Sequence, residues 1–168
     1  MCGARTVGAA LLLVGICALA SSCSGSVDVK QALEVADTSS GWYDAGIVEG
    51  KNKIVPSVSF RLKKKSDADL AGVALNVVFR HPAAAGATAE EDWDEVFVQR
   101  ADFEGGDQTK VLTVRTEKGY TGDPPQSRLD ILRHSQFRDV RARIFAKYSS
   151  SQWVEIGSVD VQRQLLVQ

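Results

Sequence analysis

Three segments of the chain alternate strictly between apolar and mostly polar residues, and this period-two pattern limits the possible folds more than any other feature. The segments span residues 54–63, 71–80 and 140–148. Successive side chains of a β-strand point to opposite faces of the sheet. The pattern therefore predicts strands with one buried face and one face in water.

Shorter apolar segments between turn residues predict further strands at 31–36, around 96–98, at 111–115 and at 154–161. One helical turn followed by a strand is the alternative for residues 27–36. Residues 37–41 and 118–126 are expected to be loops by composition. Polar turns are expected to join 54–63 to 71–80 as an antiparallel pair, and 96–98 to 111–115 as a hairpin.

Two local features refine this pattern. In the last strand Val154 and Ile156 lie on one parity but Val159 and Val161 on the other, and Gly157 stands at the change. A β-bulge at this glycine would keep both pairs on the buried face. Separately, residues 127–130 match a capping box with Asp in place of Glu or Gln, which predicts one short helix near 128–134. Its inward face would carry Leu129, Ile131 and Leu132.

About seven strands with little helix favour an all-β fold, an antiparallel immunoglobulin-like β-sandwich over residues 31–168. The body, 31–168, contains no cysteine, so it cannot carry the disulfide of antibody domains. Over about residues 31–165 the body resembles the small sandwich domains of bacterial envelope lipoproteins.

The N-terminal segment is typical of a signal peptide. Arg5 is followed by an apolar stretch, residues 7–20, which is too short to span a bilayer as a helix. Small residues then lead to Cys23. This arrangement resembles the lipobox of bacterial lipoproteins, although Leu19 lies one place earlier than that family prefers.

Two cleavage sites compete. The lipobox interpretation, which we favour, cuts after Ser22 and makes Cys23 the lipidated first residue. Ordinary signal peptidase would instead cut after Ala20, because residues 18–20 satisfy the A-x-A rule. Cys17 is the weaker lipidation candidate because bulky Ile16 precedes it. With Cys2 and Cys17 removed, Cys23 would be the one remaining cysteine, and lipidation would protect its thiol from unwanted pairing.

The resemblance implies a signal peptide at 1–22, a lipidated N-terminus and tether at 23–30, and attachment to a membrane by several acyl chains. It also implies a bacterial cell-envelope location. Ser24 after the cysteine would direct the protein to the outer membrane, facing the periplasm, in a Gram-negative cell.

The charge of the chain is nearly balanced, with a formal net charge of −1. This argues against a nucleic-acid partner, because nucleic-acid-binding proteins usually carry a basic excess. His81 and His134 are the only histidines and lie far apart, so structural or surface roles are expected rather than metal binding. The acidic segment 90–95 could offer oxygen ligands to Ca²⁺, but it lacks the spacing of a calcium loop and is expected to be a solvated loop.

Two groups of residues are candidates for a partner surface. Trp42 and Tyr43 could bind a partner from an exposed rim, but Trp42 is more simply explained as a cap on the core. Arg141, Arg143 and Phe145 share one strand face. That face could meet an acidic partner or lipid head groups, although a plain solvated face is the simpler expectation.

No residues with the spacing of a catalytic, cofactor or metal motif stand out, so neither a cofactor nor an enzymatic activity is predicted. The sequence favours a membrane-anchored binding or assembly module that contacts an envelope protein. The alternative is a small envelope hydrolase or lipid-modifying enzyme whose carboxylates meet only in the fold. A deep pocket with several carboxylates of shifted pKa would favour that enzyme.

Overall fold

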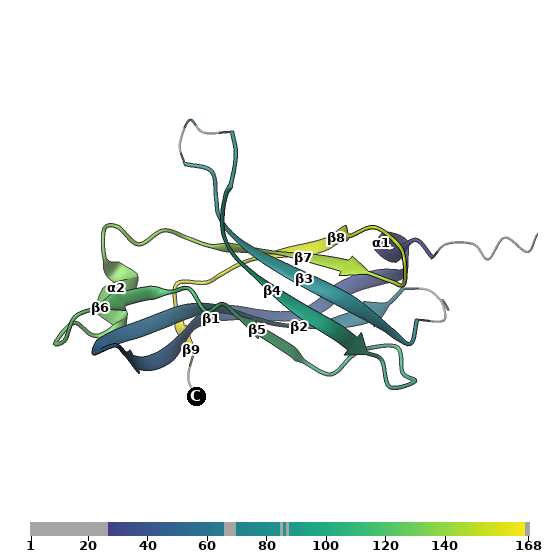
Figure 1. Cartoon of the computed structure of the whole chain (residues 1–168), viewed down its shortest axis with the longest axis horizontal. Coiled ribbons are helices and arrows are strands. Elements are labelled where there is room, and N and C mark those ends of the chain that lie inside the picture. The colour runs from purple at the N-terminus through teal and green to yellow at the C-terminus, as the bar shows by residue number, and fades with distance from the viewer. Residues whose placement is uncertain (1–26, 66–69, 85, 87, 167–168) are drawn as a thin grey trace, which may run out of the picture.

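The computed structural model describes residues 27–65, 70–84, 86 and 88–166. The leader, its cleavage sites, Cys23 and Ser24 lie outside these residues. Within the described part, nine strands form two sheets, accompanied by two short helices (Figure 1). No helix in this part is long and apolar enough to cross a bilayer.

The first sheet has the strand order β5-β2-β1-β9, and β6 also pairs with β2. All pairs are antiparallel except the short β1–β9 pair, which is parallel. The strands are β1 (Leu33–Val48), β2 (Lys51–Lys64), β5 (Leu112–Arg115), β6 (Tyr120–Gly122) and β9 (Leu165–Leu166).

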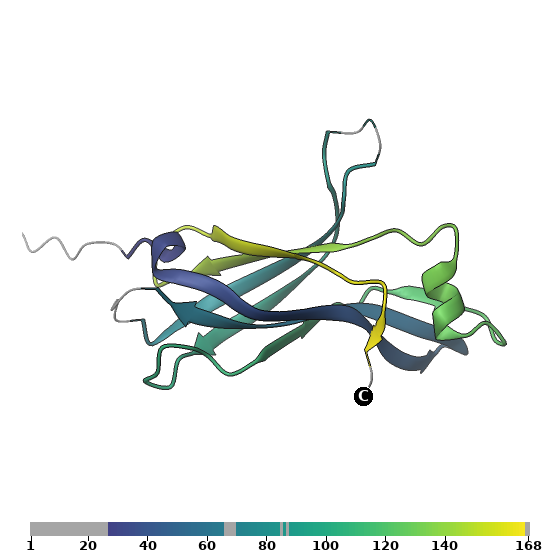
Figure 2. The same ribbon diagram turned by 180° about the vertical axis from the view of Figure 1, so that it is seen from behind.

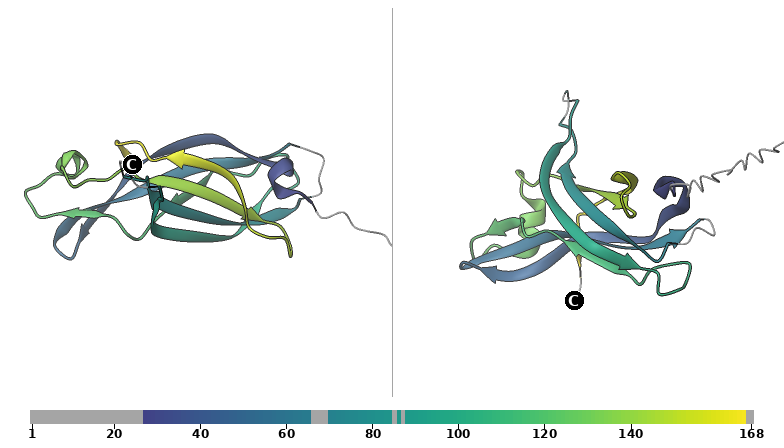
Figure 3. Two further views of the ribbon diagram at one scale, coloured as in Figure 1. Left: turned by 90° about the horizontal axis from the view of Figure 1, so that it is seen from above. Right: turned by 45° about the vertical axis from the view of Figure 1, so that its right-hand side comes forward.

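The second sheet is antiparallel throughout, in the order β4-β3-β7-β8. Its strands are β3 (Gly72–His81), β4 (Glu91–Asp102), β7 (Arg141–Lys147) and β8 (Val154–Asp160). The two sheets cross each other, as the view from behind and the view from above show (Figures 2 and 3). Buried residues of both sheets form one core.

The expected alternation is confirmed in two of the three segments. In the third, residues 54–63 of β2, Val55 and Ser57 on the expected wet face are buried as well. Buried and half-buried residues alternate without exception along β3 and β7. The buried residues of these strands meet those of β2 in one hydrophobic core. Its largest fully buried side chains are Trp42, Phe60, Phe79, Leu33, Ile54, Leu62, Leu70, Leu75 and Ile144.

The expected strand pairings are wrong in two places. Strand β2 pairs with β1, β5 and β6, whereas β3 pairs with β4 and β7, so 54–63 and 71–80 belong to different sheets. Likewise β4 and β5, expected to form a hairpin, lie in different sheets. The reason is that alternation identifies the buried face of a strand but not its hydrogen-bonded neighbour. The two members of each expected pair instead lie in opposite sheets, on either side of the core.

The N-terminal segment also differs from expectation. A helix, α1 (Val29–Ala32), precedes the first strand, so the alternative of a helical turn followed by a strand is correct. Asp28 caps this helix by accepting hydrogen bonds from two backbone N–H groups. Residues 37–41 are not a loop but part of β1. Their polar composition coincides with a register shift between Ala36 and Ser39, where Asp37 has a φ of 50°.

Two local predictions are confirmed. In β8 the register shifts so that Ile144 pairs with Gly157 but Phe145 pairs with Glu155, which leaves one extra residue in a bulge. Helix α2 (Arg128–Arg133) begins with a complete capping box between Ser127 and Asp130. Ile131 and Leu132 are buried as expected. Leu129 is 49% exposed, so its expected place on the inward face is wrong.

Gly119, just before β6, provides a test of how closely this part of the chain packs on β2. A Cβ atom at Gly119 would overlap the backbone carbonyl oxygen of Ile54 and lie 2.7 Å from Val55 Cγ1. Gly119→Ala should therefore lower the free energy of unfolding by about 1–3 kcal/mol in urea denaturation. Gly106→Ala is the matched control, because its Cβ would come no closer than 3.4 Å to any atom. Equal stability of the two variants would contradict this packing.

Candidate functional site

The outer face of the β4-β3-β7-β8 sheet gathers three arginines. Arg80 on β3 is the direct partner of Arg141 on β7, and Arg143 lies two residues further along β7. All three alternate with buried residues, which places them on the face away from the core. We call Arg80, Arg141 and Arg143 the arginine cluster.

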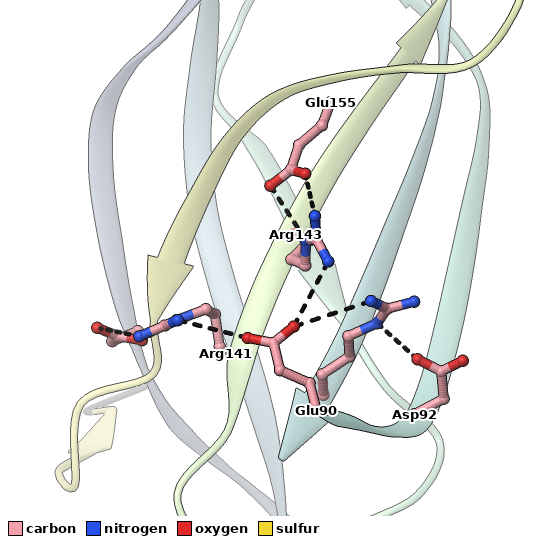
Figure 4. A network of polar contacts seen from close by, with 7 residues as sticks. Glu90, Asp92, Arg141, Arg143 and Glu155 are labelled. Carbon is pink, nitrogen blue, oxygen red and sulfur yellow. Dashed lines mark hydrogen bonds and ion pairs between the residues drawn. The ribbon is translucent and has the colours of Figure 1, made fainter. Parts of the chain in front are cut away.

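One carboxylate lies among all three guanidinium groups (Figure 4). Glu90, just before β4, has its carboxylate oxygens 3.8 Å from Arg80 Nη1, 3.4 Å from Arg141 Nη1 and 3.5 Å from Arg143 Nη1. Glu90 comes from the β3–β4 connection, which projects from the body of the domain (Figure 1). It offsets the repulsion that three neighbouring positive charges would otherwise feel.

Each arginine also has an acidic partner of its own. Asp92 Oδ1 lies 2.5 Å from Arg80 Nε, as an ion pair without hydrogen-bond geometry. Arg141 donates from Nε to Asp160 at 2.6 Å. Arg143 forms a two-pronged pair with Glu155, donating from Nε at 3.1 Å and also from Nη2 (Figure 4). Bidentate pairs of this kind are the strongest form of the interaction.

These contacts fix the protonation states of the groups. The hydrogen bond from Arg143, assisted by its positive charge, lowers the pKa of Glu155 below its ordinary value of 4.5. The pKa values of Arg141 and Arg143 are raised, mainly by their hydrogen bonds to Asp160 and Glu155. Arg141, Arg143 and Glu155 are therefore held in their charged forms, which suits recognition of charged groups better than proton transfer.

An open depression of about 510 Å³ lies beside the arginine cluster. Besides the three arginines, Glu90 and Glu155, its lining includes Thr88, Ala89 and Ser158. The lining is therefore mostly charged or polar.

Further along the same face, aromatic side chains replace the charges. Phe97 on β4 is 58% exposed and Trp153, just before β8, is 40% exposed. Their rings meet edge to face with centroids 6.2 Å apart. Phe145 is half-buried on β7, and the Arg143 guanidinium lies 5.6 Å from its ring. We call Phe97, Phe145 and Trp153 the aromatic patch.

The residues predicted for a partner surface do not all lie on one surface. Arg141, Arg143 and Phe145 lie together on the outer face of β7, as expected. Tyr43 is on β1 in the other sheet, so it cannot share a surface with them. Trp42 is fully buried, which corrects its assignment to a partner surface and agrees with its role as a core residue.

Trp42 is the centre of an aromatic cluster at one end of the core. Its ring centroid lies 4.7 Å from that of Phe137, 5.6 Å from that of Tyr120 and 6.0 Å from that of Trp93. His81 stacks on Trp93 and bonds through Nδ1 to the Asp139 carbonyl at 2.9 Å, so its role is structural. His134 caps α2. Among the described residues, no three His, Cys, Asp or Glu side chains are grouped closely enough to hold a metal ion.

The acidic segment 90–95 was wrongly expected to be a solvated loop. Residues 91–95 lie in β4, and Glu90 and Asp92 pair with the arginine cluster. Phe97, Trp153 and Arg80 were also missed as members of the site. The available signal was that Arg80, Arg141 and Arg143 all occupy outward positions of alternating strands. Three arginines this close together need nearby carboxylates to offset the repulsion between their charges.

Comparison of the chain with protein-family models, with curated proteins and with solved structures found no match.

The Arg143–Glu155 pair predicts a specific pH dependence. A carboxyl group with a lowered pKa in the folded state stabilises the fold above its unfolded pKa, and this contribution disappears as the pH falls through the folded pKa. Glu155→Gln should therefore be less stable than the wild type at pH 7, by about 1 kcal/mol or less for a partly exposed pair. The difference should shrink below a pH of about 4.5, in denaturant titrations at successive pH values.

The matched control for this prediction is Glu117→Gln, which removes an exposed carboxylate outside the network. It should change stability little at any pH. A difference between Glu155→Gln and the wild type that persists unchanged into strong acid would contradict the proposed cause.

Proposed function

We propose that this chain is a lipid-anchored binding module of the bacterial cell envelope, and that it contacts a protein partner through the outer face of the β4-β3-β7-β8 sheet. The carrying observation is that the aromatic patch and the arginine cluster lie side by side on this one exposed face. Aromatic residues and arginine are the residue types most enriched at the centres of protein interfaces.

The shape of the face supports a protein partner. Phe97 and Trp153 are exposed side chains on an open sheet, not the lining of a deep apolar cavity of the kind that holds small ligands. The arginine cluster is balanced by Glu90, Asp92, Glu155 and Asp160. A region of paired charges beside exposed aromatics corresponds to one side of the polar rim that borders the apolar centre of an interface.

The same charges favour binding over the enzymatic alternative. A carboxyl group that acts as a general acid near neutral pH needs a raised pKa. Glu155, Glu91 and Asp130 instead have lowered pKa values, each first because of a hydrogen bond that favours the ionised form. Glu155 and Glu91 hold ion pairs with Arg143 and Arg138, and Asp130 completes the capping box of α2.

The strand order supports an immunoglobulin-like topology for the module. In such domains strands A, B and E form one sheet, and C and its neighbours F and G form the other. Here β1, β2 and β5 take the places of A, B and E, while β3, β7 and β8 take those of C, F and G. Strand β4 then corresponds to the additional strand beside C, and β9 and β6 are additions to the first sheet.

The anchor would hold the domain by the end that carries α1. The described chain begins at Val27, only a few residues after Cys23, and α1 follows at once. A tether this short would keep that end near the membrane surface. Localisation to the envelope, and to the outer membrane in a Gram-negative cell, follows from the lipobox-like segment and Ser24.

Lipidation can be tested in cells that express the protein. We expect a fatty-acid analogue to label the wild type and Cys17→Ala but not Cys23→Ala, because only Cys23 would carry the acyl chains. Label incorporation is read after purification of each protein. Equal labelling of Cys23→Ala and the wild type would refute the anchor.

The partner surface can be tested by crosslinking the tethered protein in its own membrane. Phe97→Ser combined with Trp153→Ser should abolish recovery of a crosslinked protein, yet change stability little because both side chains are exposed. Ile47→Ser is the matched control, since Ile47 is 68% exposed at the β1–β2 turn. Unchanged crosslinking in the double variant would refute this surface.

A further inference from the structure

The outer face of the opposite sheet carries a pocket of different chemistry, independent of the proposed partner surface. Its volume is about 430 Å³. Strand pairing places its residues in two neighbouring rows. In one row Ser59 on β2 lies between Ser39 on β1 and Thr113 on β5, and in the next Ser57 on β2 lies beside Arg115 on β5.

Ser57 forms the floor of this pocket and lacks a partner. It is fully buried, and its Oγ has no hydrogen-bond partner in the described structure. Burying a hydroxyl without a hydrogen bond is unfavourable, and most buried polar groups avoid it. Because this hydroxyl is covered, a ligand oxygen would supply the missing acceptor only once neighbouring side chains move aside.

Arg115 supplies the positive charge. Its guanidinium lies 3.6 Å from the centre of the Tyr43 ring, which fixes the side chain over the pocket. Among the described residues no carboxylate forms an ion pair with Arg115, and none lines the pocket. Unlike the arginine cluster, this arginine therefore has its charge available for a ligand.

The remaining walls supply hydroxyl donors and limit the size of the ligand. Ser59 Oγ and Thr113 Oγ1 are hydrogen-bonded at 2.9 Å, so one of the two protons remains free to donate. Leu166 on β9 closes another side, lying over Gly41, where an added Cβ would come within 2.7 Å of Leu166 Cδ2. The pocket thus combines an arginine, several hydroxyls and one apolar wall.

We propose that this hydroxyl pocket binds a phosphate group, held by the Arg115 guanidinium, the Ser57 hydroxyl and the Ser59–Thr113 pair. Arginine and hydroxyl donors are the usual protein partners of phosphate oxygens. Because these donors come from two rows of a sheet, they suit a tetrahedral anion with oxygens in several directions better than a planar carboxylate. The phosphate can be free or part of a small monoester.

Titration calorimetry of the purified protein with inorganic phosphate at constant ionic strength tests this site. We expect saturable binding that Ser57→Ala and Arg115→Ala each weaken roughly tenfold or more, as removal of a hydrogen bond to a charged group does. Arg133→Ala, which removes an exposed arginine from α2, should bind phosphate as the wild type does. Acetate should bind more weakly than phosphate.

A second measurement separates a binding role from a structural one. Without phosphate, Ser57→Ala should be as stable as the wild type or more stable, because no hydrogen bond of Ser57 is lost. Tighter binding of glycerol 3-phosphate than of inorganic phosphate would identify a monoester as the ligand, and the reverse would identify the free anion. Absence of saturable phosphate binding, or unchanged binding by Ser57→Ala, would overturn the proposal.

Discussion

The fold depends on one packing constraint: the apolar faces of alternating strands in two sheets must fill a single space between them. The buried positions of β2, β3 and β7 supply much of that core, and side chains such as Phe60, Phe79 and Ile144 are fully enclosed there. Burial of each such side chain contributes about 1.5–3 kcal/mol, so the inward positions tolerate little change. The outward positions of the same strands remain free to carry other chemistry, and both proposed sites lie on them.

Local patterns in the sequence predicted several of the elements and their faces, although they gave α1 only as an alternative and missed the full length of β1 and the short strand β6. Alternation identified the buried sides of β3 and β7, Gly157 marked a bulge, and Ser127 with Asp130 marked the start of α2. The pairing of strands was not predictable in this way, because two strands joined by a turn can either share a sheet or face each other across the core. The polar residues 37–41 indicated a loop because a bulge in a long strand has the composition of a turn.

The same limit decided which site residues could be predicted. Arg141, Arg143 and Phe145 could be grouped from one strand, since a period of two is enough to place them together. Glu90 and Phe97 come from a different part of the chain and reach the same face only through the β3–β4 pairing. The pocket under Arg115 depends on three strands and on a buried hydroxyl whose missing partner is visible only in three dimensions. The two outer faces also differ physically. On one face carboxylates pair with the arginines, whereas on the other, among the described residues, Arg115 has no carboxylate partner and Ser57 Oγ has no hydrogen-bond partner.

The position of α1 has a geometric consequence. Helix α1 lies at one end of the long axis of the domain, while α2, β6 and the β1–β2 turn lie at the other (Figures 1 and 2). The strands run roughly along this axis, so both outer faces flank it. A domain held at the α1 end, with its long axis perpendicular to the bilayer, would present its two outer faces sideways. Neighbours diffusing in the same membrane would then meet these faces directly, whereas a partner on a facing surface would meet only the α2 end.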